Sequence, residues 1–249
     1  MEDFSLLVDL HRGSERQGPG GDAETRLALE LAKLPPKAKF KALDVGCGTG
    51  ALTLQLAHCL DADITAVDLS TDFIETLADR ALEQGLAWKI RPLVASMENL
   101  PFQAGEFDLI WSEGAVYNMG FEAGVLAWRR FLTPGGVLVV SEITWTTAER
   151  PRALQDYWNA QYPQIDTAGG KMAVLERLGY QPMGYFVLPE TCWLDNYYRP
   201  LEESFPAFLA RHPGDSQALK LLEAEREEFA FYDKYKNYYS YGMYIARKS

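Results

Sequence analysis

The chain has 249 residues and a mass of 28.0 kDa, which is enough for one α/β domain with a substantial buried core. Its formal net charge is −11 at pH 7 and it has no concentrated basic cluster, which argues against binding to a nucleic-acid backbone. Its three cysteines have no C-x-x-C spacing, so they indicate neither a disulfide framework nor a metal site.

The first part of the chain alternates short β-rich runs with amphipathic helical patterns, which is typical of a doubly wound parallel sheet. Asp22 is the expected cap of the first helix, and Pro35 and Pro36 are expected to end it. An Asp72–Glu75 box is expected to begin the third. The predicted helices cover 24–34, 51–60, 72–85 and 121–132, and the predicted strands cover 39–45, 63–70, 89–96, 107–114 and 137–145, with a turn at 134–136 before the last.

Beyond residue 146 the pattern changes, because Tyr, Trp and Pro become frequent. A long charged amphipathic helix is predicted over 216–235, between strands over 183–189 and 238–248. We therefore divide one domain into a cofactor-binding core over 22–145 and a region over 146–249 that completes the sheet and shapes a substrate cleft.

The junction between the first strand and the next helix reads KALDVGCGTGALTLQLA, residues 41–57. A strand that turns sharply into a helix leaves the first N–H groups of the helix unpaired and facing the turn. Gly46 and Gly48 can adopt positive φ, so the backbone can lie close to a nucleotide-like ligand. The stretch is therefore predicted to be a binding loop.

Asp68 closes the second predicted strand, about twenty residues beyond the glycine loop. In an open parallel sheet this end of the strand faces the ligand crevice, where a carboxylate can accept hydrogen bonds from both hydroxyls of a ribose. The alternative is an ordinary strand–turn–helix with a chance acid. Ala51 at the third glycine position does not exclude NAD, and no Lys-Ser or Lys-Thr follows the glycines as a phosphate-binding P-loop requires.

Five linked motifs carry a resemblance to a known family: LDVGCGTG (43–50), AVDLS (66–70), ASMENLPF (95–102), FDLIWSEGAVYNMGF (107–121) and LTPGGVLVVSE (132–142). Together they resemble class I S-adenosylmethionine-dependent methyltransferases, most of all the small-molecule branch related to ubiquinone and menaquinone biosynthesis. The resemblance covers about residues 20–145. It implies a Rossmann-like sheet of seven mostly parallel strands with an antiparallel last strand, and S-adenosylmethionine as the cofactor.

The resemblance also implies roles for particular positions. Relatives commonly carry an acid for the adenine amino group where this chain has Ser96 and Met97, so either residue is expected to replace that contact. The implied cofactor-binding residues are Asp44, Gly46, Cys47 and Gly48 at the methionine part, Asp68 at the ribose, Leu69 near the adenine, Ser96 and Met97, and Ser112 beside Glu113 near the methyl group.

The sulfonium methyl group is already activated, so the protein must chiefly align the acceptor for in-line displacement and exclude water. A general base is needed only where the acceptor carries a proton of high pKa. The candidates are Glu113, which we place first, His11, Tyr117 and Glu142. Glu113 has an alternative role, which is to bind the amino group of the cofactor or to cap the following turn.

Residues 1–21 include the Gly/Pro-rich stretch RQGPGG, and in similar enzymes such segments fold over the cofactor as a lid. The alternative is a disordered terminus. We expect Tyr117, Asn118, Trp145 and Tyr198 to face the substrate. The other aromatic residues beyond 190, Tyr197 among them, could line a pocket for a planar or cationic substrate, but strand packing or a dimer surface is the preferred explanation.

Two other functions compete with methyl transfer to a small molecule. Tyr232 and Lys236 form the Y-x-x-x-K pair of NAD(P)-dependent short-chain oxidoreductases, although they end a late acidic helix, and a non-catalytic S-adenosylmethionine-binding protein would carry the same glycine loop. The sequence has no membrane-length apolar run and no secretory leader pattern, so we expect a cytoplasmic protein with no membrane, nucleic-acid or metal partner. A homodimer is compatible with this interpretation, and the acceptor atom (O, N, C or S) stays open.

Overall fold

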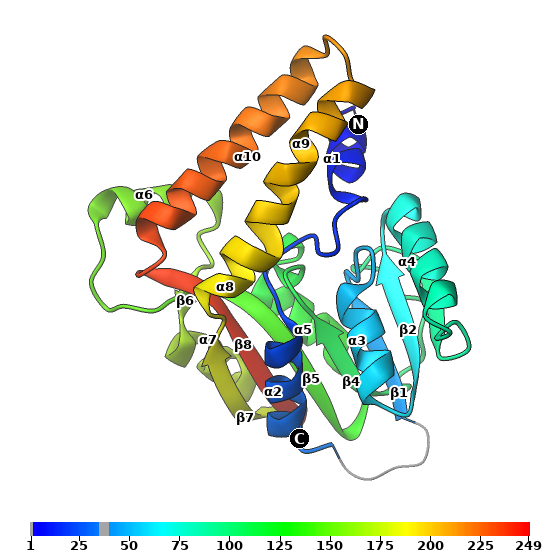
Figure 1. Ribbon diagram of the computed structural model, residues 1–249. Helices are drawn as coiled ribbons and strands as arrows, with labels where there is room; N and C mark the ends of the chain where they lie inside the picture. Colours follow the sequence, from blue (N-terminus) through cyan, green and yellow to red (C-terminus); the bar gives the residue numbers. More distant parts are fainter. Residues whose placement is uncertain (1, 35–39) are drawn as a thin grey trace.

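The computed structural model of the protein describes residues 2–34 and 40–249. One twisted sheet runs through the molecule in the strand order β3-β2-β1-β4-β5-β8-β7 (Figure 1). Strands β1 to β5 are mutually parallel, and β8 is antiparallel to both β5 and β7. The predicted fold class is confirmed: a Rossmann-like sheet with an antiparallel last strand. The strands are β1 (Phe40–Val45), β2 (Ala62–Asp68), β3 (Ile90–Val94), β4 (Phe107–Ser112), β5 (Leu132–Trp145), β7 (Tyr180–Val187), β8 (Tyr239–Lys248), and the two-residue β6 (Asp166–Thr167), which pairs only with β5.

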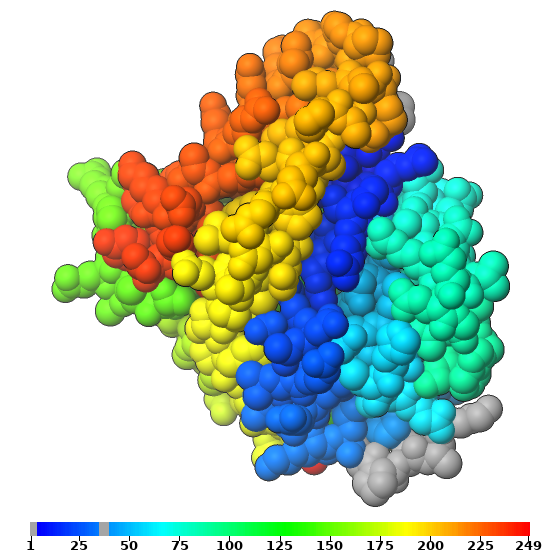
Figure 2. All heavy atoms as spheres, viewed as in Figure 1, coloured from blue at the N-terminus to red at the C-terminus, as the bar shows by residue number. Residues whose placement is uncertain are grey.

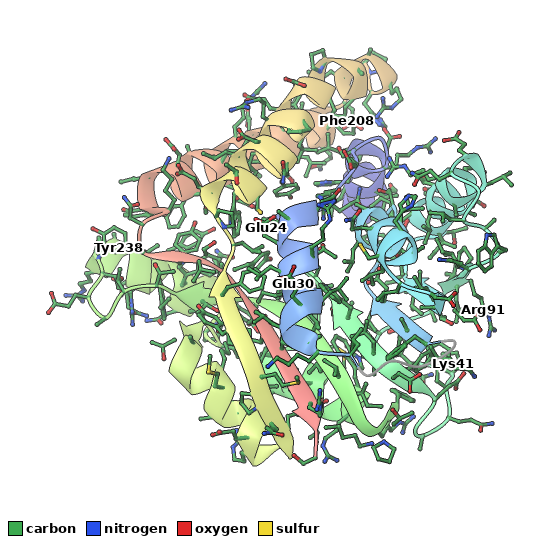
Figure 3. All side chains as sticks on the ribbon, turned by 60° about the horizontal axis from the view of Figure 1, so that its bottom comes forward. Glu24, Glu30, Lys41, Arg91, Phe208 and Tyr238 are labelled. Atoms are coloured by element: carbon green, nitrogen blue, oxygen red, sulfur yellow. The ribbon has the colours of Figure 1, made fainter. Side chains whose placement is uncertain are left out.

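Helices cover both faces of the sheet, because successive side chains of a buried strand point to opposite faces. Ala42 of β1 belongs to one core with α2, α3 and α4, and the adjacent Leu43 belongs to the other core with α5 and α7. Figure 3 shows α2, marked by Glu24 and Glu30, lying along the sheet. These helices are α2 (Asp22–Ala32), α3 (Ala51–Cys59), α4 (Thr71–Glu83), α5 (Phe121–Arg129) and α7 (Ala168–Arg177).

Three further helices stand above the carboxyl ends of the parallel strands and form what we call the helical cap (Figure 1). They are α1 (Glu2–His11), α9 (Arg199–Arg211) and α10 (Ser216–Tyr235). Their apolar sides share a small separate core that includes Leu10, Phe205, Phe208 and Leu222. Asp9 adds polar contacts between α1 and the end of α9, since it accepts hydrogen bonds from Arg211 and His212 at 2.8 and 2.9 Å.

The remaining short elements connect these layers. They are η1 (Val116–Asn118), α6 (Arg152–Gln161), α8 (Glu190–Trp193) and the π-helical turn η2 (Leu194–Tyr198), which leads directly into α9. In Figure 2 the chain from α1 to α2 occupies the space between α9 and the α3–α4 side of the molecule. None of the helices in the described ranges is both long and apolar enough to span a bilayer.

Two predicted helix caps are wrong. The residue that caps α2 is Gly21, and it makes no side-chain cap bond, whereas Asp22 is already helical and reaches back to Arg16. Helix α4 is capped by Ser70, whose hydroxyl accepts from the N–H of Phe73, so the helix begins before the predicted box. Pro35 and Pro36, predicted to end the first helix, lie outside the described residues.

The predicted turn at 134–136 lies inside a strand. Leu132 pairs with Phe107, and Val137 pairs with Leu109, so the residues between Leu132 and Val137 form a bulge within β5. Bulges preserve strand pairing on either side of the extra residues. The strand therefore begins at Leu132, five residues earlier than the sequence pattern indicates, and α5 ends at Arg129.

Candidate active site

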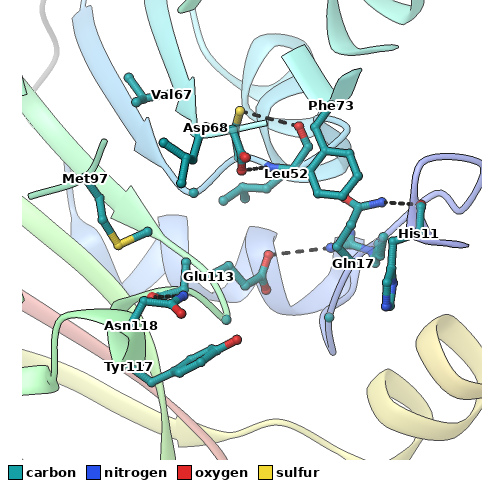
Figure 4. Close-up of a pocket in the computed structure, with 18 of the residues that line it drawn as sticks. His11, Gln17, Leu52, Val67, Asp68, Phe73, Met97, Glu113, Tyr117 and Asn118 are labelled. Atoms are coloured by element: carbon teal, nitrogen blue, oxygen red, sulfur yellow. Dashed lines mark hydrogen bonds and ion pairs between the residues drawn. The ribbon is translucent and has the colours of Figure 1, made fainter. Parts of the chain in front are cut away.

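A cavity of about 630 Å³ lies where the carboxyl ends of β1, β2 and β4 meet the helical cap. This is the position at which open α/β sheets bind ligands. Figure 4 shows Glu113, Tyr117 and Asn118 on one side of the cavity and His11 and Gln17 on the other. Six carboxylates line it: Asp44, Asp68, Glu98, Glu113, Glu225 and Glu228. Arg16 is the single arginine or lysine among the described residues of the lining.

The glycine loop follows β1 and forms the floor of the cavity. Gly46 and Gly48 have φ angles of 75° and 54°, in the left-handed region that glycine adopts at little cost. The N–H groups of Gly46 and Cys47 both donate to the carbonyl of Val67, which ties the loop to β2. A Cβ atom at Gly46 would collide with Ala115. The loop thus keeps a bare backbone surface that faces the cavity.

Asp68 ends β2 beside this loop. One carboxylate oxygen accepts from the N–H of Gly48 and the other from the N–H of Ser70, both at 2.9 Å. Burial raises the pKa of Asp68, and these backbone donors offset part of the effect. Because each carboxylate oxygen can accept more than one hydrogen bond, the side chain is held in place and can still accept from a ligand. Leu69 follows it at the cavity wall and is 63% exposed.

Two buried carboxylates face the middle of the cavity. Asp44 accepts from the hydroxyl of Thr53 at 2.6 Å, while its second oxygen has no partner. Glu113 follows β4 and lies 3.5 Å from Arg16, and one of its oxygens also lacks a hydrogen-bond partner. Burial raises the pKa of both carboxyl groups to about 7. The negative charge of Glu113 raises the pKa of Asp44 further, whereas the positive charge of Arg16 lowers the pKa of Glu113 in part. A ligand that brings positive charge and N–H donors would satisfy both.

The segment between α1 and α2 is fastened to the glycine loop. The side-chain amide of Gln17 accepts from the N–H of Thr49 at 2.8 Å and donates to its hydroxyl at 2.9 Å. Arg80 of α4 donates to the same hydroxyl at 2.7 Å and to the carbonyl of Ser14 at 3.0 Å. These bonds hold residues 14–17 across the mouth of the loop, in the region predicted to be a lid.

The wall formed after β3 contains Ser96, Met97 and Glu98. The Met97 carbonyl already accepts from the indole N–H of Trp128 at 3.1 Å, and the Ser96 hydroxyl accepts from the N–H of Glu98 at 3.2 Å. Glu98 is exposed and lines the cavity, so an acid is present two residues after Ser96. It offers a carboxylate where the sequence suggests that one is missing.

The opposite end of the cavity belongs to the helical cap. His11 is 5% exposed, and its Nε2 lies 3.8 Å from a carboxylate oxygen of Glu225, while its Nδ1 and the second Glu225 oxygen have no partner. The ring of Tyr197 stacks on His11 with centroids 6.2 Å apart. Glu228 also lines this end, and Tyr117 faces it from the Glu113 side of the cavity. It therefore combines aromatic surface with carboxylates.

Several residues predicted for the site do not line the cavity. The Ser112 hydroxyl donates to the backbone of β1, and Trp145 is packed under Arg150 in the core of the sheet. Tyr198 is buried and donates to Glu228 from behind, whereas its neighbour Tyr197 faces the cavity. Glu142 is buried in an ion pair with Lys171 at 2.9 Å.

The remaining predicted residues do line it: Asp44, Gly46, Cys47, Gly48, Asp68, Leu69, Ser96, Met97, Glu113, Tyr117, Asn118 and His11. Their roles stay predictions. The sequence reasoning missed three lining residues, Glu98, Glu225 and Glu228. Arg16 and Gln17 also line the cavity and belong to the segment predicted to be a lid, and Tyr197 lines it although the sequence reasoning favoured packing for it. The three-residue spacing of Glu225 and Glu228 places both on one helical face and was the available signal for that pair.

Comparison with known proteins agrees with the resemblance found in the sequence. Residues 42–136 match the family model described as a methyltransferase domain. A ribosomal protein arginine N-methyltransferase of Schizosaccharomyces pombe is 32% identical over 60% of this chain and 28% of its own length. A ubiquinone/menaquinone biosynthesis C-methyltransferase of Azotobacter vinelandii is 32% identical over 48% of this chain and 47% of its own length.

The likeness to solved structures extends along the whole chain. A methyltransferase of Geobacter sulfurreducens in complex with S-adenosyl-L-homocysteine superposes with a TM-score of 0.83, over 100% of this chain and 98% of the other, at 19% identity. The first curated relatives are matched over only 28 to 55% of their own length. The predicted family resemblance is therefore confirmed over the core, and the solved structures share the fold.

Proposed function

Because residues 42–136 match a methyltransferase domain and solved structures of the same fold contain S-adenosyl-L-homocysteine, we propose that the protein transfers the methyl group of S-adenosylmethionine to a small-molecule acceptor. The observation that carries the proposal is the pair of buried carboxylates beside the glycine loop. Asp44 and Glu113 both line the cavity, and each has one buried oxygen without a hydrogen-bond partner, so positive charge and N–H donors would satisfy them.

The described residues suit each part of this cofactor. The bare backbone of Gly46–Gly48 would leave room for the amino-acid end, and Asp44 and Glu113 would accept from its ammonium group. Asp68 is fixed by two backbone N–H groups in a position to accept from the ribose hydroxyls. Leu69 and the wall that contains Glu98 would hold the adenine end, and the carboxylate of Glu98 could accept from the exocyclic amino group.

The bound cofactor supplies an activated methyl group, so the protein's task is to align the acceptor and keep water out. Tyr117 and Asn118 border the space next to Glu113 (Figure 4). His11 lines the cavity, its Nε2 lies 3.8 Å from Glu225 and its Nδ1 has no hydrogen-bond partner, so His11 is a candidate to take a proton from the acceptor. This role is an alternative to the assignment of Glu113 as base.

A small acceptor fits the enclosure better than a macromolecule. The cavity volume of about 630 Å³ is typical of small-molecule sites, and the helical cap and residues 14–17 cover its approaches. Its six carboxylates would repel the phosphates of a nucleic acid. The same repulsion disfavours the diphosphate of NAD, and neither Tyr232 nor Lys236 lines the cavity.

The first test is calorimetric titration with S-adenosylmethionine, S-adenosylhomocysteine and NAD, repeated with Asp68→Ala. A hydrogen bond to a charged group contributes about 1.5–3 kcal/mol, so the variant should bind both sulfur cofactors about 10- to 100-fold more weakly. Asp63→Ala, an exposed carboxylate on the same strand, is the matched control and should bind like the wild type. Binding of NAD alone would refute the proposal.

A further inference from the structure

Glu225 and Glu228 face the cavity from one side of α10, one helical turn apart. They lie at the end formed by the helical cap and take no part in holding the glycine loop. This end of the cavity has no role in the binding of the cofactor described above. It is therefore the space left for the acceptor.

The two carboxylates are poorly compensated by the protein. Within residues 2–34 and 40–249, no lysine or arginine lies within 4.0 Å of either group. Glu225 is 8% exposed, and its Oε1 faces His11 while its Oε2 has no partner. Glu228 accepts one hydrogen bond, from Tyr198 at 3.1 Å. Burial and the neighbouring charge of Glu225 raise the pKa of Glu228, whereas Tyr198 and His11 lower it. Glu228 keeps exposed surface, so its carboxylate can be approached by a cation.

Aromatic rings surround the same space. Tyr197 stacks on His11, and Tyr117 is 45% exposed toward the cavity. Burial raises the pKa of Tyr117, and so does the nearby charge of Glu228, so its ring lies in the same electrostatic environment. A cation gains from both kinds of neighbour, because it pairs with carboxylates and is attracted to the faces of aromatic rings.

We propose that this end of the cavity binds a methyl acceptor that carries a positively charged amino or ammonium group, with Glu225 and Glu228 as its counter-charges and Tyr117 and Tyr197 as its walls. The inference rests on the proposed function, since it assigns the acceptor of that same site. The proposed acceptor class is amines. It excludes neutral phenols and quinols, and also carboxylic acids, which other methyltransferases can modify. The charged group recognised here need not be the atom that is methylated.

The test is a charge-matched series titrated by calorimetry into the protein saturated with S-adenosylhomocysteine. Phenethylamine, 2-phenylethanol and phenylacetate share a ring and differ in charge, and ethanolamine, ethylene glycol and glycolate form a smaller set. At least one amine should bind tenfold or more tightly than its neutral partner, and its affinity should fall tenfold or more in the double variant Glu225→Gln, Glu228→Gln. The amide side chains keep the shape of the site and remove both charges.

Glu223→Gln with Glu227→Gln is the matched control, because both residues are on the same helix and neither lines the cavity. Their replacement should leave amine affinity unchanged. Equal binding of neutral and charged partners, or amine affinity insensitive to the site variant, would overturn the proposal. Titration with S-adenosylhomocysteine alone distinguishes failure of the acceptor class from failure of the proposed function. If the wild type binds this cofactor but shows no preference for amines, only the acceptor class is refuted. If the wild type does not bind this cofactor, the proposed function is refuted.

Discussion

The two ends of the cavity are built in different ways. The end beside the sheet uses backbone and short side chains at the carboxyl ends of neighbouring strands, as Gly46, Gly48 and Asp68 show. The end beneath the helical cap uses longer side chains from separate helices, and the contact between His11 and Glu225 joins positions more than 200 residues apart in the chain. The parallel sheet holds the residues of the first end together. The residues of the second end come together only when the helices of the cap pack against one another.

The largest expected effect is the loss of stability caused by a substitution in the core of the helical cap. Phe208 is fully buried in the cap core, and Figure 3 places it in the helical layer away from Lys41 at the start of β1. Phe208→Ala should lower the free energy of unfolding by about 3–5 kcal/mol, as other buried Phe-to-Ala changes do. Denaturant titration measures this change.

The same variant sharpens the comparison between the two ends. If the cap governs only the acceptor end, the Phe208→Ala protein that remains folded should still bind S-adenosylhomocysteine, with weaker amine binding. Leu56→Ala, in the core between α3 and the sheet, is the control and should weaken cofactor binding. Equal loss of both ligands in the two variants would contradict a division of the cavity into two ends.

An intermediate effect is expected in the pH dependence of the sheet end. The pKa values of Asp44 and Glu113 are both about 7, and a bound cation favours their ionised forms and so lowers these pKa values. Below pH 7 binding must release protons, so affinity for S-adenosylmethionine should fall as the pH drops from 8 to 6, by up to about tenfold per pH unit for each proton released.

Calorimetry in buffers of different ionisation enthalpy measures the protons released, and Glu113→Gln should reduce the number. The stability of the free protein should change in the opposite direction. A carboxyl group whose pKa rises on folding adds stability that is complete below its unfolded pKa, here 3.8 for Asp44, and that is lost as the pH rises toward 7. Affinity that is flat between pH 6 and 8 would count against these two groups as cofactor ligands.

The smallest expected effect concerns the segment between α1 and α2, which Gln17 fastens to the glycine loop. Gln17 makes two hydrogen bonds with Thr49, so Gln17→Ala should cost about 1 kcal/mol and weaken cofactor binding about fivefold. Gln181→Ala, on an exposed position of β7, is the control. Stopped-flow release of S-adenosylhomocysteine should show the change mainly as faster dissociation, because the segment lies across the glycine loop. Unchanged kinetics would argue against a lid.

The sequence predicted the sheet end well because its signals are local. The strand ending at Val45, the glycines that follow it and the acid at Asp68 each have a fixed place relative to a strand end. The bulge in β5 was missed because Pro134 and two glycines are also typical of a turn between separate elements.

The cap was harder to predict because its helices depend on one another. The ten residues of α1 make a short helix, and Leu10 is buried only by contact with α9 and α10. Trp145 and Tyr198 were expected at the substrate because aromatic residues suit both pockets and cores. Which of two adjacent tyrosines, Tyr197 or Tyr198, faces the cavity depends on backbone geometry that composition does not encode.

That geometry is the π-helical turn η2, which immediately precedes α9. A π-helix closes its hydrogen bonds over one more residue than an α-helix does, and such turns are frequent at functional sites. Deletion of one residue here would rotate the preceding side chains by about 100° relative to α9 and replace the residue that meets the acceptor. The glycine loop and Asp68 would be untouched. A change in the length of this turn would therefore alter the cap end of the cavity alone.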